Sequence, residues 1–190
     1  MLNQMLIFLL DTLLGLFSLV LLLRFYMQLL RAPHRNPLSQ FLIAITDFLV
    51  RPARRMIPGF GGIDFPTLLL AWLTQLILLA GVYMLQGYSF TSTVGLAAGA
   101  LALLALVEIV KMTLYIIMAA VIIQAVLSWF NPYSALAPVL DSFTRPFLGV
   151  IRARIPPIGN IDLSPLFVLI IIQLLLFVVA RTEGEISRLF

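Results

Sequence analysis

Four long apolar stretches constrain the fold of this chain more than any other feature. They run over residues 2–23, 65–85, 94–130 and 163–180. A helix that spans a bilayer needs about 20 predominantly apolar residues, so the first, second and fourth stretches fit one span each. Hydrophobic residues make up 62% of the chain and charged residues 11%, against about 45–50% and 25% in soluble domains. We therefore expect an all-α polytopic membrane protein and exclude a soluble fold.

The third stretch is too long for one upright crossing, since 37 residues correspond to about 55 Å of helix at 1.5 Å per residue. If it crosses once, the arginine-rich segments 24–64 and 131–162 lie on the same side of the membrane. The positive-inside rule favours this arrangement and places both segments in the cytoplasm. We therefore predict four spans and both termini outside. The third span covers about residues 108–130, and residues 94–107 form an interfacial or tilted apolar extension.

The two halves of the chain repeat the same short motifs in the same order. Asn36-Pro37 and Arg51-Pro52 match Asn131-Pro132 and Arg145-Pro146, and each half continues with an Ile-Pro and an Ile-Asp pair. Two spans per half give the copies the same orientation in the membrane. We assign residues 1–90 to the first repeat, with spans at about 2–23 and 65–85, and residues 91–190 to the second, with spans at about 108–130 and 163–180.

An amphipathic segment lies between the two spans of each repeat, over residues 38–49 and 136–147. Apolar residues recur at helical spacing, with polar residues on the opposite face. Both segments are too short to span. They either lie in the headgroup plane, with arginines near lipid phosphate, or pack on the protein's own helices.

A Pro- and Gly-rich loop follows each amphipathic segment and ends in an aspartate that is placed to cap the next helix. Alternatively, these aspartates have a functional role. Asp64 beside Arg55, and Asp162 beside Arg154, would form a paired charged site at the cytoplasmic mouth. The candidates for contact with a partner or with lipid are the charged residues of these segments: Arg51, Arg54, Arg55, Asp64, Arg145, Arg152, Arg154 and Asp162.

Polar residues inside the apolar stretches form a second set of candidates: Asp11, Gln75, Glu108, Lys111 and Gln173. An ionisable residue at bilayer depth is costly and marks a functional site by default. Asp11 and Glu108 correspond across the duplication, and Glu108 and Lys111 can pair as i and i+3. These three residues either lie at the outer interface or contribute to a proton or cation path. The two glutamines are expected to hydrogen-bond between helices.

Composition excludes several kinds of chemistry. The chain has no cysteine, which rules out disulfides and thiolate metal sites. His34 is the single histidine and is interpreted as an exposed loop residue. No GxSxG, HExxH or phosphate-loop pattern occurs. We therefore expect no enzymatic activity, no cofactor and no metal. The arginines lie beside apolar spans, which indicates lipid headgroups and not nucleic acid as their direct partners.

The repeated order of Asn-Pro, amphipathic stretch, Arg-Pro, Arg-x-Ile-Pro and Ile-Asp resembles the YggT family, also called YlmG, as two tandem copies. The second copy departs in two places: Arg54-Arg55 becomes Arg152-x-Arg154, and the position of Arg24 is alanine, at Ala119 or its neighbour. The resemblance implies a small multi-pass protein of the bacterial inner membrane, linked to osmotic-stress tolerance and cell division. Plastid relatives are linked to nucleoid distribution and to haem attachment in a cytochrome b6 complex.

Two functions are compatible with these features. We expect a non-enzymatic membrane scaffold or assembly factor that contacts membrane lipids and recruits a protein partner on the cytoplasmic face, and a homo-oligomer is compatible with it. The alternative is a small ion transporter or channel component that uses the intramembrane residues Asp11, Glu108 and Lys111.

Overall fold

The structure, a computed structural model, describes residues 1–33, 36–57, 59, 62–88, 94–131, 134–154 and 162–188. These residues form α1 (Leu2–Leu29), α2 (Pro37–Met56), α3 (Phe65–Leu85), α4 (Val94–Phe130), α5 (Ala137–Arg152) and α6 (Ser164–Ser187), with no strand among them. Four of the helices, α1, α3, α4 and α6, are long and apolar enough to cross a membrane. The predicted all-α, multi-pass fold is therefore confirmed. His34 and parts of the repeated motifs, Pro58, Pro132, Ile155, Pro156 and Ile161, lie outside the described residues.

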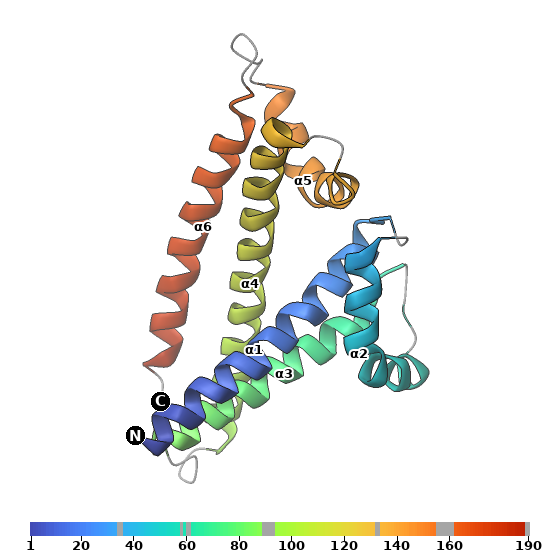
Figure 1. The fold of residues 1–190 in the computed structure, drawn as a ribbon. Helices are drawn as coiled ribbons and strands as arrows, with labels where there is room; N and C mark the ends of the chain where they lie inside the picture. The colour runs from blue at the N-terminus through green and yellow to red at the C-terminus, as the bar shows by residue number, and fades with distance from the viewer. Residues whose placement is uncertain are drawn as a thin grey trace.

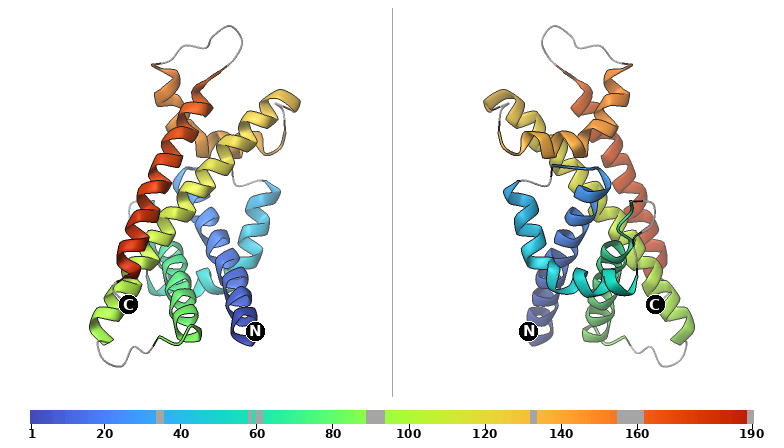
Figure 2. Two further views of the ribbon diagram at one scale, coloured as in Figure 1. Left: turned by 90° about the vertical axis from the view of Figure 1, so that its left-hand side faces the viewer. Right: turned by 90° about the vertical axis from the view of Figure 1, so that its right-hand side faces the viewer.

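Two helical hairpins, one from each half of the chain, build the molecule (Figure 1). α1 runs antiparallel to α3, and α4 runs antiparallel to α6, with the two hairpins inclined to each other. α2 and α5 lie beside the ends of the hairpins that are remote from the termini, and the two termini share the opposite end in both further views (Figure 2). This placement matches two repeats of the same order, each with a short helix between its two long ones.

One apolar core joins the repeats. It contains Leu21 and Leu22 of α1, Ala71 of α3, Ile116 of α4 and Phe143 of α5, all buried. Lipid is as apolar as these side chains, so close packing and not removal from water stabilises this core in a membrane. The two halves therefore pack on each other and are not merely linked in sequence.

The third apolar stretch forms a single helix of 37 residues, α4. Its first turns pack on the first repeat, where Trp72 Nε1 donates to the carbonyl oxygen of Ala102 at 3.1 Å. Ala100 and Leu104 are buried beside Ile186 of α6. The extension predicted over residues 94–107 is therefore continuous with the third span.

The amphipathic helices pack by one face and leave apolar residues uncovered on another. The buried residues of α2 recur at three- and four-residue intervals, while Phe41 and Phe48 are 56% and 70% exposed. α5 has the same character, with Val150 57% exposed. Each helix therefore packs on the bundle, as one of the two sequence alternatives expected, and also presents an apolar face. The buried residues are Ser39, Leu42, Thr46 and Val50 in α2 and Val139, Phe143, Thr144 and Leu148 in α5.

The Asn-Pro motif begins α2 but does not begin α5. Asn36 is the N-cap of α2, and its Oδ1 accepts a hydrogen bond from the Ser39 backbone N–H at 2.8 Å, a capping arrangement that satisfies a free helix donor. In the second repeat the helix begins at Ala137, six residues after Asn131, with Leu136 as N-cap. α5 is consequently shorter, with 16 residues against 20 in α2.

Candidate functional site

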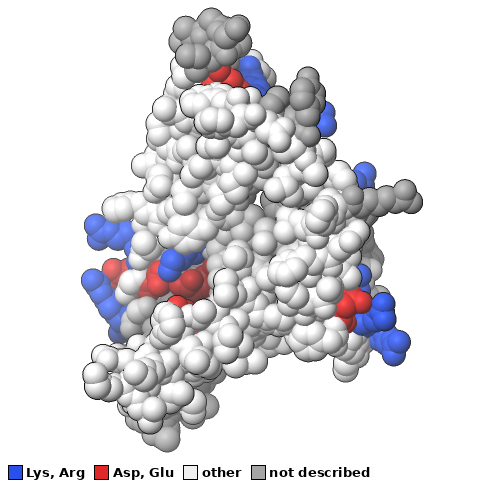
Figure 3. All heavy atoms as spheres, in the orientation of Figure 1, with Lys and Arg blue, Asp and Glu red and all other residues white. Residues whose placement is uncertain are grey.

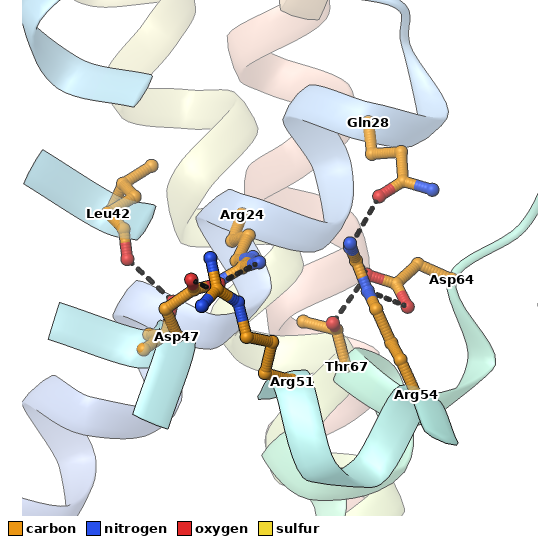
Figure 4. Close-up of polar contacts among 9 residues, drawn as sticks. Arg24, Gln28, Leu42, Asp47, Arg51, Arg54, Asp64 and Thr67 are labelled. Atoms are coloured by element: carbon orange, nitrogen blue, oxygen red, sulfur yellow. Dashed lines mark hydrogen bonds and ion pairs between the residues drawn. The ribbon is translucent and has the colours of Figure 1, made fainter. Parts of the chain in front are cut away.

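Arg24 is buried in the apolar helix α1, and its guanidinium reaches across to α2 (Figure 4). Its Nη1 donates to Thr46 Oγ1 at 2.7 Å and its Nη2 to Asp47 Oδ1 at 2.9 Å. Arg51 contacts the other Asp47 oxygen at 3.1 Å. A buried charge is tolerated when it is paired and hydrogen-bonded. The hydrogen bond from Arg24 lowers the pKa of Asp47, against the opposing effect of burial, so this attachment of α2 to α1 is ionic at neutral pH.

A second ion pair joins the end of α2 to the start of α3. Arg54 donates from Nε and Nη2 to the two oxygens of Asp64, at 3.3 and 2.5 Å, and Asp64 is 3% exposed. Thr67 Oγ1 donates to the same carboxylate at 2.5 Å, and Arg54 Nη2 also donates to Gln28 Oε1 of α1 at 2.8 Å. Burial alone would raise the pKa of Asp64, but Arg54 and Thr67 outweigh it and the pKa is lowered. The ionised pair therefore ties three helices together.

The second repeat contains the same pair in a more open form. Arg152 Nε donates to Asp162 Oδ2 at 2.8 Å, and the two side chains are 49% and 39% exposed. Asp162 also accepts the backbone N–H of Ser164 at 2.9 Å. In the first repeat the equivalent position is Pro66, which has no N–H to offer. Burial opposes ionisation of Asp162, but its bonds to Ser164 and Arg152 prevail and lower its pKa.

A neutral hydrogen bond replaces the Arg24 attachment in the second repeat. The Thr144 hydroxyl of α5 donates to Gln124 Oε1 of α4. Ala119, the residue expected at the position of Arg24, instead lines an apolar cavity of about 420 Å³ between the repeats. Each amphipathic helix is therefore attached through a buried threonine, by an arginine in one copy and by a glutamine in the other.

The expectation that Arg55 and Arg154 lie beside the two aspartates is wrong. Arg54 and Arg152 hold these positions, each ten residues before its aspartate. One residue turns a helix by about 100°, so Arg55 points away from α3 when Arg54 faces it. Arg154 lies two residues beyond the end of α5. Both side chains are exposed, and neither forms an ion pair within the described part of the chain.

The contacts and the motifs of the two repeats do not follow the same spacing. Residues that form corresponding hydrogen bonds in the two repeats are 98 positions apart in the sequence. The Arg-Pro motifs are 94 positions apart, so relative to these contacts the second motif lies about one helical turn earlier than the first. Arg145 is accordingly exposed, without the ion pair that Arg51 forms. The pairs separated by 98 are Thr46 with Thr144, Arg54 with Arg152, Asp64 with Asp162 and Gln75 with Gln173.

A charged cluster lies where α4 passes the C-terminal turns of α6. Lys111 Nζ donates to Glu108 Oε1 at 2.9 Å, as the i, i+3 spacing predicts, and to Glu183 Oε2 at 2.8 Å. Figure 3 shows acidic and basic atoms gathered on this part of a largely uncharged surface. Lys111 therefore links the third and fourth spans through Glu183, while Glu108 pairs with it within α4.

The other intramembrane candidates are not gathered into one site. Asp11 is exposed on α1 and forms no hydrogen bond or ion pair with any residue that the structure describes. Gln75 and Gln173 each donate to a methionine sulfur of α4, at 3.2 Å to Met112 and 3.5 Å to Met118. Both glutamines thus bond between helices, as expected. In the described ranges no group of three His, Asp or Glu side chains is placed to hold a metal ion.

Three charged residues of these clusters, Arg24, Asp47 and Glu183, are missing from the sequence-based candidates. Arg24 was counted only as a topogenic charge. The available signal was that apolar residues continue beyond it to Leu30, so that it lies inside the helix and needs a partner. Glu183 gave no signal of its own, because 72 residues separate it from Lys111.

Known proteins resemble the chain over nearly its whole length. The CCB3/YggT family model matches residues 3–85 and 103–182, one segment in each half, which fits tandem repeats. A Pseudomonas aeruginosa protein, PA0392, is 39% identical over 92% of this chain and 87% of its own length. Escherichia coli YggT is 31% identical, over 95% and 90% of the two chains, and a Vibrio alginolyticus protein named for the proC 3′ region is 32% identical, over 94% and 95%. No solved structure matches. The chain therefore belongs to the CCB3/YggT family.

Proposed function

We propose that this protein is a non-enzymatic membrane scaffold or assembly factor that holds two amphipathic helices in fixed positions for a protein partner. The observation that carries the proposal is the attachment of α2 through Arg24, Thr46 and Asp47, with its neutral counterpart between Gln124 and Thr144. An apolar face alone would let such a helix rotate on the membrane surface. Directional hydrogen bonds to a buried group specify its rotation as well as its position.

The surface that these helices offer is both basic and apolar. Arg55, Arg145 and Arg154 are exposed without an ion pair to any described residue. Arg51 and Arg54 are already engaged, with Asp47 and Asp64. Under the positive-inside rule this surface faces the cytoplasm of a bacterial inner membrane, with both termini outside. An acidic segment of a partner protein has the complementary charge, and the uncovered apolar residues of α2 and α5 suit the adjoining lipid.

A crosslinking pull-down from native membranes tests the proposal. The informative variant combines Arg55→Ala with Arg154→Ala, since neither side chain has an ion pair within the described residues, and their removal should leave the fold intact. Arg188→Ala removes an exposed arginine at the end of α6 and serves as the matched control. A defined partner should be captured by the wild type and the control and lost from the double variant. Recovery of the same partner from all three proteins, or of none from the wild type, contradicts the proposal.

The resemblance to the family directs where the partner is sought. Osmotic-stress tolerance, cell division and assembly of membrane complexes are the processes that it suggests. The first two can be compared in a deletion strain complemented with the Arg55→Ala, Arg154→Ala variant. Growth at high osmolarity measures osmotic tolerance, and cell length measures division. Full complementation by the double variant would show that neither process requires these two arginines.

An ion transporter or channel component is the second candidate, and the cluster of Glu108, Lys111 and Glu183 favours it. Two carboxylates against one ammonium leave a net negative charge on apolar helices, a feature typical of cation pathways. Reconstituted protein should then carry a proton or cation flux that Glu108→Gln abolishes. The scaffold hypothesis predicts no flux from either protein.

A further inference from the structure

The α4–α6 hairpin contains a long groove. The groove has a volume of about 1110 Å³ and lies between the C-terminal half of α4 and α6, over a floor that includes Val121 and Leu148. Its wall on α6 runs from Leu163 to Phe177, about 21 Å at 1.5 Å per residue. One leaflet of a bilayer has about half of the 30 Å hydrocarbon thickness, so the groove is long enough for an acyl chain.

The first repeat closes the corresponding space with its own side chains. Leu21 and Leu22 of α1 and Ala71 of α3 are all 0% exposed. In α6 the residues that line the groove stay open. Leu166, Ile170, Leu174 and Phe177 are 50–63% exposed at three- and four-residue intervals.

The polar residues of the groove gather at one end. Ser128 and Trp129 lie in the last turn of α4. Arg152, the last residue of α5, pairs there with Asp162, two residues before α6. The remainder of the lining is apolar apart from Gln124 and Gln173. A ligand that fits this lining has a polar head and one long apolar tail.

Among the described residues, Arg152 uses only part of its hydrogen-bonding capacity at this polar end. Only its Nε donates, to Asp162, and its two terminal nitrogens make no hydrogen bond to any described residue. In the first repeat Nη2 of Arg54 is occupied by both Asp64 and Gln28. A guanidinium edge that is not bonded to a described residue matches the oxygens of a phosphate, which arginine binds by two parallel N–H bonds.

From these observations we infer that the α4–α6 groove is a binding site for an anionic phospholipid. One acyl chain lies along α6 between Leu166 and Phe177, and the phosphate accepts hydrogen bonds from the terminal nitrogens of Arg152. The exposed Arg154 adds positive charge at the same end, and each such charge near the membrane surface attracts anionic lipid. The site does not depend on the scaffold proposal, since it involves lipid and the second repeat alone.

Tryptophan fluorescence measures occupancy of the groove directly. The chain has two tryptophans, so Trp72→Phe leaves Trp129, at the polar end of the groove, as the sole reporter. The protein is reconstituted in phosphatidylcholine vesicles that contain a small fraction of phosphatidylglycerol, with bromine on the acyl chains of one lipid or the other. Quenching by brominated phosphatidylglycerol should exceed its share of the lipid. Arg152→Gln should reduce this preference about fivefold, and Arg188→Gln, at the far end of α6, should not change it.

A second variant separates the groove from the charge. Ala125→Phe fills the lining beside Trp129 while leaving Arg152 in place, and it should abolish retention of phosphatidylglycerol in native mass spectrometry without lowering the melting temperature. Soluble glycerol phosphate, which has the headgroup without a chain, should not displace the lipid.

Three results would overturn the inference. The first is quenching in proportion to lipid fraction in the wild type, and the second is a preference that survives both Arg152→Gln and Ala125→Phe. The third is a Trp129 shielded from both brominated lipids in a protein that crosslinks as a dimer, which would assign the groove to a second copy of the chain.

Discussion

Asp64→Ala and Asp162→Ala make the same change at repeat-related positions of very different burial. The Asp64 side chain is 3% exposed and that of Asp162 is 39% exposed. Removing Asp64 deletes hydrogen bonds from a charged partner, worth about 1.5–3 kcal/mol, and leaves the fully buried Thr67 hydroxyl without this acceptor, at a further cost of about 1 kcal/mol or more. Arg54 is 40% exposed and keeps Gln28, so no buried charge is stranded. We expect a loss of about 3 kcal/mol.

The loss for Asp162→Ala should be smaller. An exposed ion pair contributes about 0–1 kcal/mol, and loss of the bond to the Ser164 N–H brings the total to about 1 kcal/mol. In a chain of this size 1 kcal/mol shifts the melting temperature by about 2–4 °C. Asp64→Ala should therefore lower it by about 6–12 °C and Asp162→Ala by about 2–4 °C.

Thermal melts of both variants and the wild type in one detergent, followed by circular dichroism, measure the difference. Equal shifts would show that burial of the carboxylate does not determine the strength of this pair. A larger shift for Asp162→Ala would contradict the argument altogether.

Three further predictions concern pH, the charged cluster and topology. Because the folded-state pKa of Asp64 is lowered, the stability that its carboxylate gives the fold is complete well above the unfolded pKa of about 3.9 and is lost as the pH falls through the folded value. With respect to this group, the melting temperature should be constant from about pH 5.5 to 7. Asp64→Asn should reduce the fall in melting temperature at acid pH. Lys111→Met leaves two partly buried carboxylates uncompensated and should destabilise by about 2–4 kcal/mol, whereas Lys111→Arg should restore most of the stability; equal melting temperatures for both variants would contradict the cluster. Since the chain has no cysteine, an impermeant maleimide applied to intact cells should label Gln4→Cys, and should label Ala135→Cys, in the exposed α4–α5 connection, only after the membrane is opened. The reverse pattern would invert the proposed orientation.

Within the candidate site, residue identity was easier to predict than pairing. The arginines and aspartates of the two loop segments were identified from the duplication alone, and the Glu108–Lys111 pair followed from helical spacing. Choosing Arg54 over Arg55, or Arg152 over Arg154, depends on which side of the helix faces the next one. Neighbouring residues differ by about 100° around the helix axis, and composition carries no information about that rotation.

By itself the sequence determined the four spans, the duplication and the clustering of arginine in two segments. Partition into a membrane depends on hydrophobicity summed over about 20 consecutive residues, which can be counted along a chain. Only the tertiary structure decided that Arg24 holds Thr46 and Asp47, that Glu183 joins Lys111, and that one hairpin closes while the other opens into a groove. These features depend on the angles and rotations at which separate helices meet, and these are set by the packing of side chains far apart in sequence.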